Sequence, residues 1–276
     1  MSLFIASLNS GSNGNCYYVG NEHDAILVDA GISCRETERR LLRLGLLMKK
    51  IRAIFISHEH SDHINGVTVL SKKYGLPVYI TPATLQSSGL QLAHHLVVPF
   101  TAYQPVTIGN MVISAFPKLH DAAHPHSFIV ERRGIKVGVL TDIGAACEHV
   151  IRHFAECHAA FLEANYDDEL LENGRYPYYL KRRIRGGNGH LSNSQALEIF
   201  INHRSAHLSH LLLSHLSKDN NRPELVHELF SQHANGTEII VASRYEESAV
   251  YHINGQPATQ QQPVDVHSGR VQFSLF

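Results

Sequence analysis

Several features that would assign the chain to other protein classes are scarce or missing. Only four cysteines occur among 276 residues, too few for a disulfide scaffold, so we expect a reducing cytoplasm. No run reaches the ~18 apolar residues of a membrane span, and the first residues lack the basic and apolar segments of a secretory signal. Lys and Arg number 24 against 25 Asp and Glu, a net charge of −1. Any polyanion must therefore bind to a local patch.

Histidine, by contrast, is abundant. The chain has 21 histidines, nearly as many as lysine and arginine together. Histidine is the commonest metal ligand and titrates near neutrality. We expect most of these residues to lie on the surface or in loops, so their positions must decide which of them bind metal.

Short β-rich runs alternate with amphipathic helical patterns throughout, which is typical of an α/β domain. No Pro/Gly/Ser-rich linker divides the chain, so we expect a single domain over residues 1–276. The only low-complexity tract is a run of glutamines at 260–262. A hairpin signal at Arg133-Gly134 favours a mixed sheet or two sheets over a purely parallel one. The expected strands are 3–8, 16–19, 25–29, 53–57, 78–81, 111–116, 127–132, 135–141, 160–163, 210–214, 238–242 and 249–253. The expected helices are 35–44, 64–74, 145–154, 192–203 and 223–233.

Two local motifs have structural interpretations. Ser192 with Gln195 three residues later predicts a capping box at the start of a helix. The segment Ser-Gly-Ser-Asn-Gly-Asn at 10–15 lacks the spacing of a phosphate-binding loop. It is either a hairpin turn between the first two strands or part of an active-site wall.

The strongest chemical signal follows the apolar run 54–56. The next residues include His58, His60, Asp62 and His63, four potential ligands in six positions. A surface turn has no need of three imidazoles, whereas a metal ion binds neutral imidazole and carboxylate together. His58 and His60 can converge on one ion, while Asp62 and His63 point to a second. Nitrogen and oxygen ligands favour Zn²⁺ or Mn²⁺.

The His-x-His-x-Asp-His motif at 58–63 resembles that of the metallo-β-lactamase fold superfamily, and the resemblance covers essentially the whole chain. It implies a four-layer αβ/βα sandwich with two metal ions between its sheets. It also implies that Asp29 orients ligands rather than binding metal. The implied ligands are His58, His60 and His120 for the first ion, Asp62, His63 and His215 for the second, and Asp142 between the two. His124 and His126 are rivals for the role of His120, and His210 is a rival for that of His215.

Two further segments resemble motifs of the tRNA 3′-processing nucleases. They are 161–166 and 189–196, and they imply that His190 is a general acid held by Glu163. Such an acid is needed because an alkoxide leaves poorly without a proton. The alternative for His190 is helix capping beside Ser192. Together with Asp62, His190 and Glu163 are the residues expected to act in catalysis. Aspartate at position 142 is typical of the thiolester-hydrolase and phosphodiesterase branches.

A cluster of cations precedes the second of these motifs. Lys181, Arg182, Arg183 and Arg185 lie within five residues, beside the expected acid, where substrate phosphates would have to lie. A solvated helix face is the alternative. Residues 35–52 form a second, looser basic segment.

Three segments, 10–15, 176–184 and 215–224, resemble the YycJ/WalJ-type bacterial proteins, a branch associated with 5′→3′ exonuclease action on double-stranded DNA. This resemblance implies manganese as the native ion. Only 73 positions separate Asp142 from His215, which leaves no room for the large domain that RNA-cleaving relatives carry there. The chain also lacks an obvious long Gly/Pro-rich arm that grips tRNA.

We therefore predict a cytoplasmic, dinuclear metal phosphodiesterase, a DNA exonuclease in which a metal-bridging hydroxide attacks phosphorus. The near-neutral charge keeps a small-molecule or cyclic-nucleotide phosphodiesterase as the alternative. A non-catalytic metal-binding scaffold on the same fold is a third interpretation.

Overall fold

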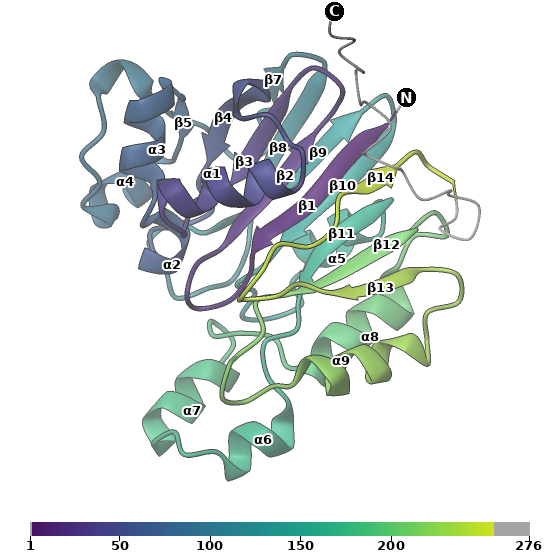
Figure 1. Cartoon of the computed structure of the whole chain (residues 1–276). Helices are drawn as coiled ribbons and strands as arrows, with labels where there is room; N and C mark the ends of the chain where they lie inside the picture. Colours follow the sequence, from purple (N-terminus) through teal and green to yellow (C-terminus); the bar gives the residue numbers. More distant parts are fainter. Residues whose placement is uncertain (1, 257–276) are drawn as a thin grey trace, which may run out of the picture.

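The computed structural model describes residues 2–256, which form two mixed seven-stranded sheets packed face to face (Figure 1). The glutamine tract at 260–262 and the end of the expected 1–276 domain lie outside the described residues. The first sheet has the order β14-β1-β2-β3-β4-β5-β6 and the second β13-β12-β11-β10-β9-β8-β7.

The strands of the first sheet are β1 Leu3–Asn9, β2 Cys16–Gly20, β3 Ala25–Val28, β4 Ile51–Phe55, β5 Val78–Tyr79, β6 Val97–Val98 and β14 Tyr251–Ile253. Those of the second are β7 Val106–Ile108, β8 Met111–Pro117, β9 His126–Arg132, β10 Ile135–Leu140, β11 Ala159–Glu163, β12 His210–Ser214 and β13 Glu238–Val241. The α-helices are α1 Cys34–Arg43, α2 Ser61–Ile64, α3 Val67–Tyr74, α4 Pro82–Ser88, α5 Glu148–Phe154, α6 Asp168–Asn173, α7 Tyr178–Arg185, α8 Asn193–His203 and α9 Pro223–Ser231. Short 3₁₀ turns cover Met48–Lys50 and His94–Leu96.

Three apolar cores hold the layers together. The central core lies between the sheets, where Phe55 of β4 meets Phe128 of β9 edge to face at 5.7 Å. A second core packs α1 and α3 on the outer face of the first sheet. A third packs α5, α8 and α9 on the outer face of the second. Helix, sheet, sheet and helix therefore form four layers, which confirms the predicted αβ/βα sandwich.

Covering both faces of each sheet explains why its central strands are continuous apolar runs. β3 is Ala-Ile-Leu-Val and is buried at every position, as is β12. β3 and β4 are parallel, and so are β10, β11 and β12. The carboxyl ends of the parallel strands within each sheet therefore meet at one edge, and this places the loops that follow them side by side.

Every strand expected from the sequence is present, with ends that differ by a few residues. The hairpin is confirmed, because β9 and β10 pair antiparallel around Arg133-Gly134, both at positive φ. The capping box formed by Ser192 and Gln195 is confirmed as well.

The single helix expected over 64–74 is wrong. The structure has two helices there, α2 and α3, separated by Asn65 and Gly66. The break occurs because the Gly66 amide donates to the Ala30 carbonyl, and a β-carbon at Gly66 would lie 2.0 Å from the Ile32 carbonyl oxygen. Close packing against the loop after β3 thus overrides the helical pattern.

The pattern also missed β6, β7, α4, α6 and α7. No residue of helix α7 is fully buried, and its aliphatic residues are the half-buried Leu180 and Ile184 alone, so its apolar stripe is too short for periodicity to detect. Helices α6 and α7 lie together beyond the ends of the strands (Figure 1). Within residues 2–256, no helix combines the length and the apolar character that crossing a membrane requires.

Candidate metal centre

Most of the candidate ligands lie just past the ends of strands. His58 follows β4, His120 follows β8, Asp142 follows β10, and His215 comes directly after β12. Asp29 occupies the equivalent position after β3. These strands come from both sheets, and their loops meet at one end of the sandwich, so residues far apart in sequence face a common space.

Three of these side chains stand on backbone in the left-handed region. Asp29 has φ 60°, Asp142 φ 54° and His215 φ 59°. Non-glycine residues rarely adopt this conformation, and it costs about 1–3 kcal/mol at each position. The sharp turn at each strand end directs the side chain into the cluster instead of along the sheet.

The first group consists of three imidazoles. His60 Nδ1 lies 3.1 Å from His58 Nε2 and 3.3 Å from His120 Nε2. His58 and His120 are buried, while His60 is partly exposed. The structure therefore brings together all three side chains expected around a first ion.

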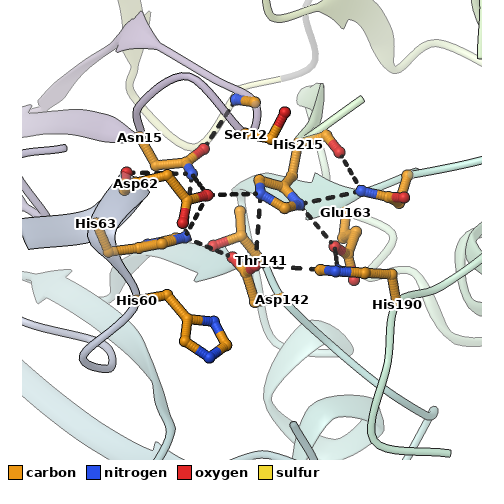
Figure 2. A network of polar contacts seen from close by, with 12 residues as sticks. Ser12, Asn15, His60, Asp62, His63, Thr141, Asp142, Glu163, His190 and His215 are labelled. Atoms are coloured by element: carbon orange, nitrogen blue, oxygen red, sulfur yellow. Dashed lines mark hydrogen bonds and ion pairs between the residues drawn. The ribbon is translucent and has the colours of Figure 1, made fainter. Parts of the chain in front are cut away.

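The second group joins Asp62, His63 and His215 (Figure 2). Asp62 Oδ2 lies 3.5 Å from His63 Nε2 and 3.4 Å from His215 Nε2. Asp142 lies between the groups: its Oδ2 is 3.2 Å from His63 Nε2, while its Oδ1 is 3.4 Å from His215 Nε2 and 3.8 Å from His120 Nε2.

A partner on the outer ring nitrogen orients four of the five imidazoles. In each, Nδ1 lies within hydrogen-bond distance of an oxygen, so an Nδ1–H that donates there leaves the Nε2 lone pair facing the cluster. The contacts are His58 to Ser57 Oγ at 2.8 Å, His63 to Asp29 Oδ2 at 2.7 Å, His120 to the Gly189 carbonyl at 3.0 Å and His215 to Glu163 Oε1 at 3.0 Å.

This donor set fits divalent cations. Ligands 2.0–2.1 Å from a tetrahedral Zn²⁺ are about 3.3 Å apart, which matches the spacing of the first group. Asp142 Oδ2 is fully buried beside His63 Nε2 at 3.2 Å, so this carboxylate needs a positive charge close by, which a bound cation supplies. The imidazole lone pairs that face one another in the first group also repel unless a cation lies between them.

The electrostatics differ between the two groups. Burial lowers the pKa of His58 well below its ordinary value and that of His120 to about 4. Both imidazoles are therefore neutral at pH 7 and keep the lone pair that metal binding needs.

In the second group, negative charge dominates. Burial opposes protonation of His215, but Asp142, Asp62 and Glu163 outweigh it and raise its pKa to about 10. His63 follows the same pattern, since Asp142, Asp29 and Asp62 overcome burial and raise its pKa well above the ordinary value. The carboxylates thus draw positive charge to this position, which a bound cation would supply.

Glu163, the last residue of β11, contacts two histidines. Its side chain is fully buried, and Oε1 lies 2.8 Å from His190 Nδ1 and 3.0 Å from His215 Nδ1. Burial raises the pKa of Glu163, but His190 and His215 outweigh it and lower the pKa to about 2. Glu163 is therefore an ionised acceptor that links His190 to the cluster.

His190 is not part of the helix cap that was its alternative role. The cap of α8 is made by Ser192 and Gln195, while the His190 side chain turns to Glu163 and remains 21% exposed. Its ring centroid is 5.2 Å from that of His120 and 5.1 Å from that of His215. His190 therefore stands at the rim of both groups.

The rival histidines lie outside both groups. His126 Nδ1 contacts the His124 carbonyl, and the His126 ring packs edge to face on Phe100. His210 contacts Ser209 Oγ and lies 3.3 Å from Glu238. Among the described residues, none of the three belongs to a group that could hold a metal ion.

Residues 24–216 match the family model described as beta-lactamase superfamily domain. The exodeoxyribonuclease YycJ of Bacillus anthracis is 35% identical over 240 residues, which cover 84% of this chain and 89% of that protein. The exodeoxyribonuclease WalJ of Streptococcus pneumoniae serotype 2 is 34% identical over 227 residues, 80% of this chain and 84% of that protein. The chain belongs to the metallo-β-lactamase superfamily.

The fold agrees with this assignment. The metallo-β-lactamase fold protein YhfI from Bacillus subtilis superposes with a TM-score of 0.70 at 18% identity, covering 91% of this chain and 100% of that one. The donor groups and the membership of this superfamily both indicate that the chain binds divalent metal ions.

Sequence reasoning did not assign a role to two asparagines that contact the candidate ligands. Asn15 Nδ2 lies 3.1 Å from Asp62 Oδ2 and 3.0 Å from His63 Nε2, and Asn165 Nδ2 donates to the His215 carbonyl. The position of Asn15 shows that loop 10–15 both connects β1 to β2 and lines the site. The glycine-rich composition of the loop was the available signal, because a β-carbon at Gly14 would lie 2.6 Å from Ile32 Cγ2.

The expected basic patch lies on α7 and is largely paired within the chain. Arg183 Nε donates to Asp121 at 2.5 Å, Arg185 pairs with the Glu172 carboxylate, and Lys181 donates to the Glu172 main-chain carbonyl. Within residues 2–256, the Arg182 side chain has no hydrogen-bond or ion-pair partner. Asp121 Oδ1 is also 3.5 Å from His120 Nε2, so the Arg183 pair connects α7 to the first group.

The role of Asp29 can be tested by metal affinity. Asp29→Asn replaces the carboxylate that holds His63 Nδ1 and should weaken divalent-metal binding by about 10–100-fold. Competition with a chromogenic chelator measures this for Zn²⁺ and Mn²⁺. Asp24→Asn, which removes a surface partner of Arg52, is the matched control, and equal affinities in the two variants would contradict the role.

Proposed function

We propose that the protein is a metal-dependent nuclease that hydrolyses phosphodiester bonds of DNA from an end. The observation that carries this proposal is the pair of donor groups on either side of Asp142, in a chain 35% identical to an exodeoxyribonuclease over most of both lengths. An aspartate that faces both groups is suited to holding two cations a few ångströms apart.

Seven residues would hold the two ions, Zn²⁺ or Mn²⁺. These are His58, His60 and His120 for the first, Asp62, His63 and His215 for the second, and Asp142 for both. When bound, such ions lower the pKa of coordinated water toward neutrality and stabilise negative charge on phosphate oxygens.

His190 is proposed as the general acid. Glu163 accepts from His190 Nδ1 at 2.8 Å and is ionised, so it fixes the orientation of the ring. Within the described residues, Nε2 of His190 has no hydrogen bond, which leaves it available to donate a proton to the leaving alkoxide oxygen. Glu163 contacts Nδ1 of His190 in the same way as the buried aspartate of a Ser-His-Asp triad contacts its histidine, where it holds the tautomer and orientation of the ring.

We also propose that residues 1–276 act as one domain in the cytoplasm. The shared core between the two sheets supports the first statement for the described residues. The four free cysteines, three of them buried, suit a reducing compartment.

A substrate panel tests the proposed function. The purified protein, supplied with Mn²⁺ or Zn²⁺, should degrade linear duplex DNA from an end faster than single-stranded RNA or a cyclic dinucleotide. Asp142→Ala should lose bound metal and activity, while Asp24→Ala should keep both. Hydrolysis of the cyclic dinucleotide alone, or full activity in Asp142→Ala, would overturn the proposal.

The general acid can be tested by changing the leaving group. His190→Ala should slow DNA hydrolysis by about 10²–10⁴-fold but leave a nitrophenyl phosphodiester nearly unaffected, since nitrophenolate departs without a proton. His227→Ala, on the exposed side of α9, is the control. Equal losses on both substrates would refute the role of His190.

Arg182 offers a test of the basic helix. Arg182→Gln removes the one cation of the 181–185 cluster that has no partner among the described residues. It should reduce the slope of log affinity for duplex DNA against log salt by about 0.9. Binding is measured by fluorescence anisotropy with the exposed Arg152→Gln as control, and an unchanged slope would place the phosphates elsewhere.

A further inference from the structure

A cavity of about 370 Å³ opens beside the second donor group. Its lining contains none of the donor residues but adjoins the backbone of His215 at two points. Leu216, which lines it, directly follows His215, and Ser10, which also lines it, accepts a hydrogen bond from the His215 amide at 2.7 Å. A molecule in this cavity therefore lies against the backbone that carries His215.

Loop 10–15 connects the same two places. At one end Asn15 contacts Asp62 and His63. At the other, Ser12 Oγ lies 3.1 Å from Arg244 Nη2, and Asn13 Nδ2 donates to the Arg244 carbonyl. The cavity wall formed by 241–246 is thus tied to the loop that contacts the donor group.

The cavity combines an apolar floor with a polar, net positive rim. Leu216, Pro223, Val241 and Ala242 form the apolar part. Tyr245, 71% exposed, adds an aromatic ring at the edge.

Two cations and one acid lie on the rim. Within residues 2–256, the Lys218 side chain has no partner, and the Arg244 guanidinium contacts only the neutral oxygens of Ser12 and Leu216. Glu246 contributes the one carboxylate of the lining. An aromatic ring, an apolar floor and unneutralised cations together match a base and its phosphate.

We propose that this cavity holds the terminal nucleotide of the strand being degraded. The base stacks on Tyr245 over the apolar floor, and the phosphate of that nucleotide lies near Lys218 and Arg244. The proposal rests on the proposed nuclease function and gives it a product size. The volume is at the lower end of the roughly 300–1,000 Å³ of small-molecule sites, which suits one nucleotide.

The position of α7 supports the same path for the strand. Arg183 of α7 reaches the first donor group through Asp121, whereas the cavity adjoins the second through His215. A strand that runs from α7 to the cavity therefore crosses both groups. The cleavable phosphodiester then lies at the donor groups, with one nucleotide beyond it.

The absence of tryptophan from all 276 residues gives a direct binding assay. Tyr245→Trp places a single indole at the cavity, and titration with deoxyadenosine 5′-monophosphate should quench its fluorescence saturably, since the base stacks on it. Tyr103→Trp, an exposed tyrosine outside the cavity lining, is the matched control and should not respond. Quenching in neither variant, or equally in both, would overturn the proposal.

The contribution of the phosphate is tested in the same variant. Adding Lys218→Gln to Tyr245→Trp should weaken the apparent affinity for the monophosphate by roughly threefold to tenfold while leaving that for deoxyadenosine unchanged. Equal loss for both ligands would contradict phosphate contact by Lys218.

Nuclease assays separate this proposal from the function on which it rests. The wild-type protein should release mononucleotides, and Tyr245→Ala should raise KM for DNA with a smaller effect on kcat. An active nuclease that releases longer products, or whose KM ignores Tyr245, overturns the cavity proposal alone. A protein inactive on every nucleic acid overturns the function, and the fluorescence titration then decides by itself whether the cavity binds a nucleotide.

Discussion

Five imidazoles and two carboxylates turn their lone pairs toward one another in a largely buried space, and the rest of the site depends on this convergence. Unshared electron pairs at 3.1–3.5 Å repel unless a proton or a cation lies between them. Burial removes the option of protonation at His58 and His120. The carboxylates around His63 and His215 draw positive charge to the other side. Divalent cations satisfy both conditions at once.

The fold maintains this convergence at a cost in backbone energy. Asp29, Asp142 and His215 all adopt positive φ at the ends of strands whose buried apolar side chains secure them in the cores. Strain of this kind persists where the surrounding structure overdetermines the conformation. The same buried surroundings let Glu163 hold two histidines, so one carboxylate couples the proposed acid His190 to the ligand candidate His215. Glu163 therefore positions both the proposed acid and one of the candidate metal ligands.

Most strands and the ligand cluster at 58–63 could be predicted from local patterns, and the resemblance of that motif to a known superfamily implied the remaining donors. Strands buried on both faces are continuous apolar runs, so each was visible, and the ligand candidates stand where those runs stop, as His215 does after β12. Helix α7 was missed because none of its residues is fully buried. The break at Gly66 was missed because only contacts with Ala30 and Ile32 require it. Hydrophobic periodicity shows which face of a helix or strand is buried. It does not show where a loop from a distant part of the sequence packs closely against the backbone.

The hydrophobic pattern by itself determined an α/β domain, and the spacing at 58–63 determined a cluster of potential metal ligands, since both are local properties. The four-layer sandwich and the more distant ligands His120, Asp142 and His215 came from the resemblance that this motif carries. Only the tertiary structure decided how those side chains are held and what surrounds them. The contact of Asn15 with Asp62, the pairing of Arg183 with Asp121 and the cavity beside His215 each join segments tens to hundreds of positions apart. Such contacts depend on how the two sheets pack and on where their loops meet, and no short stretch of chain encodes either.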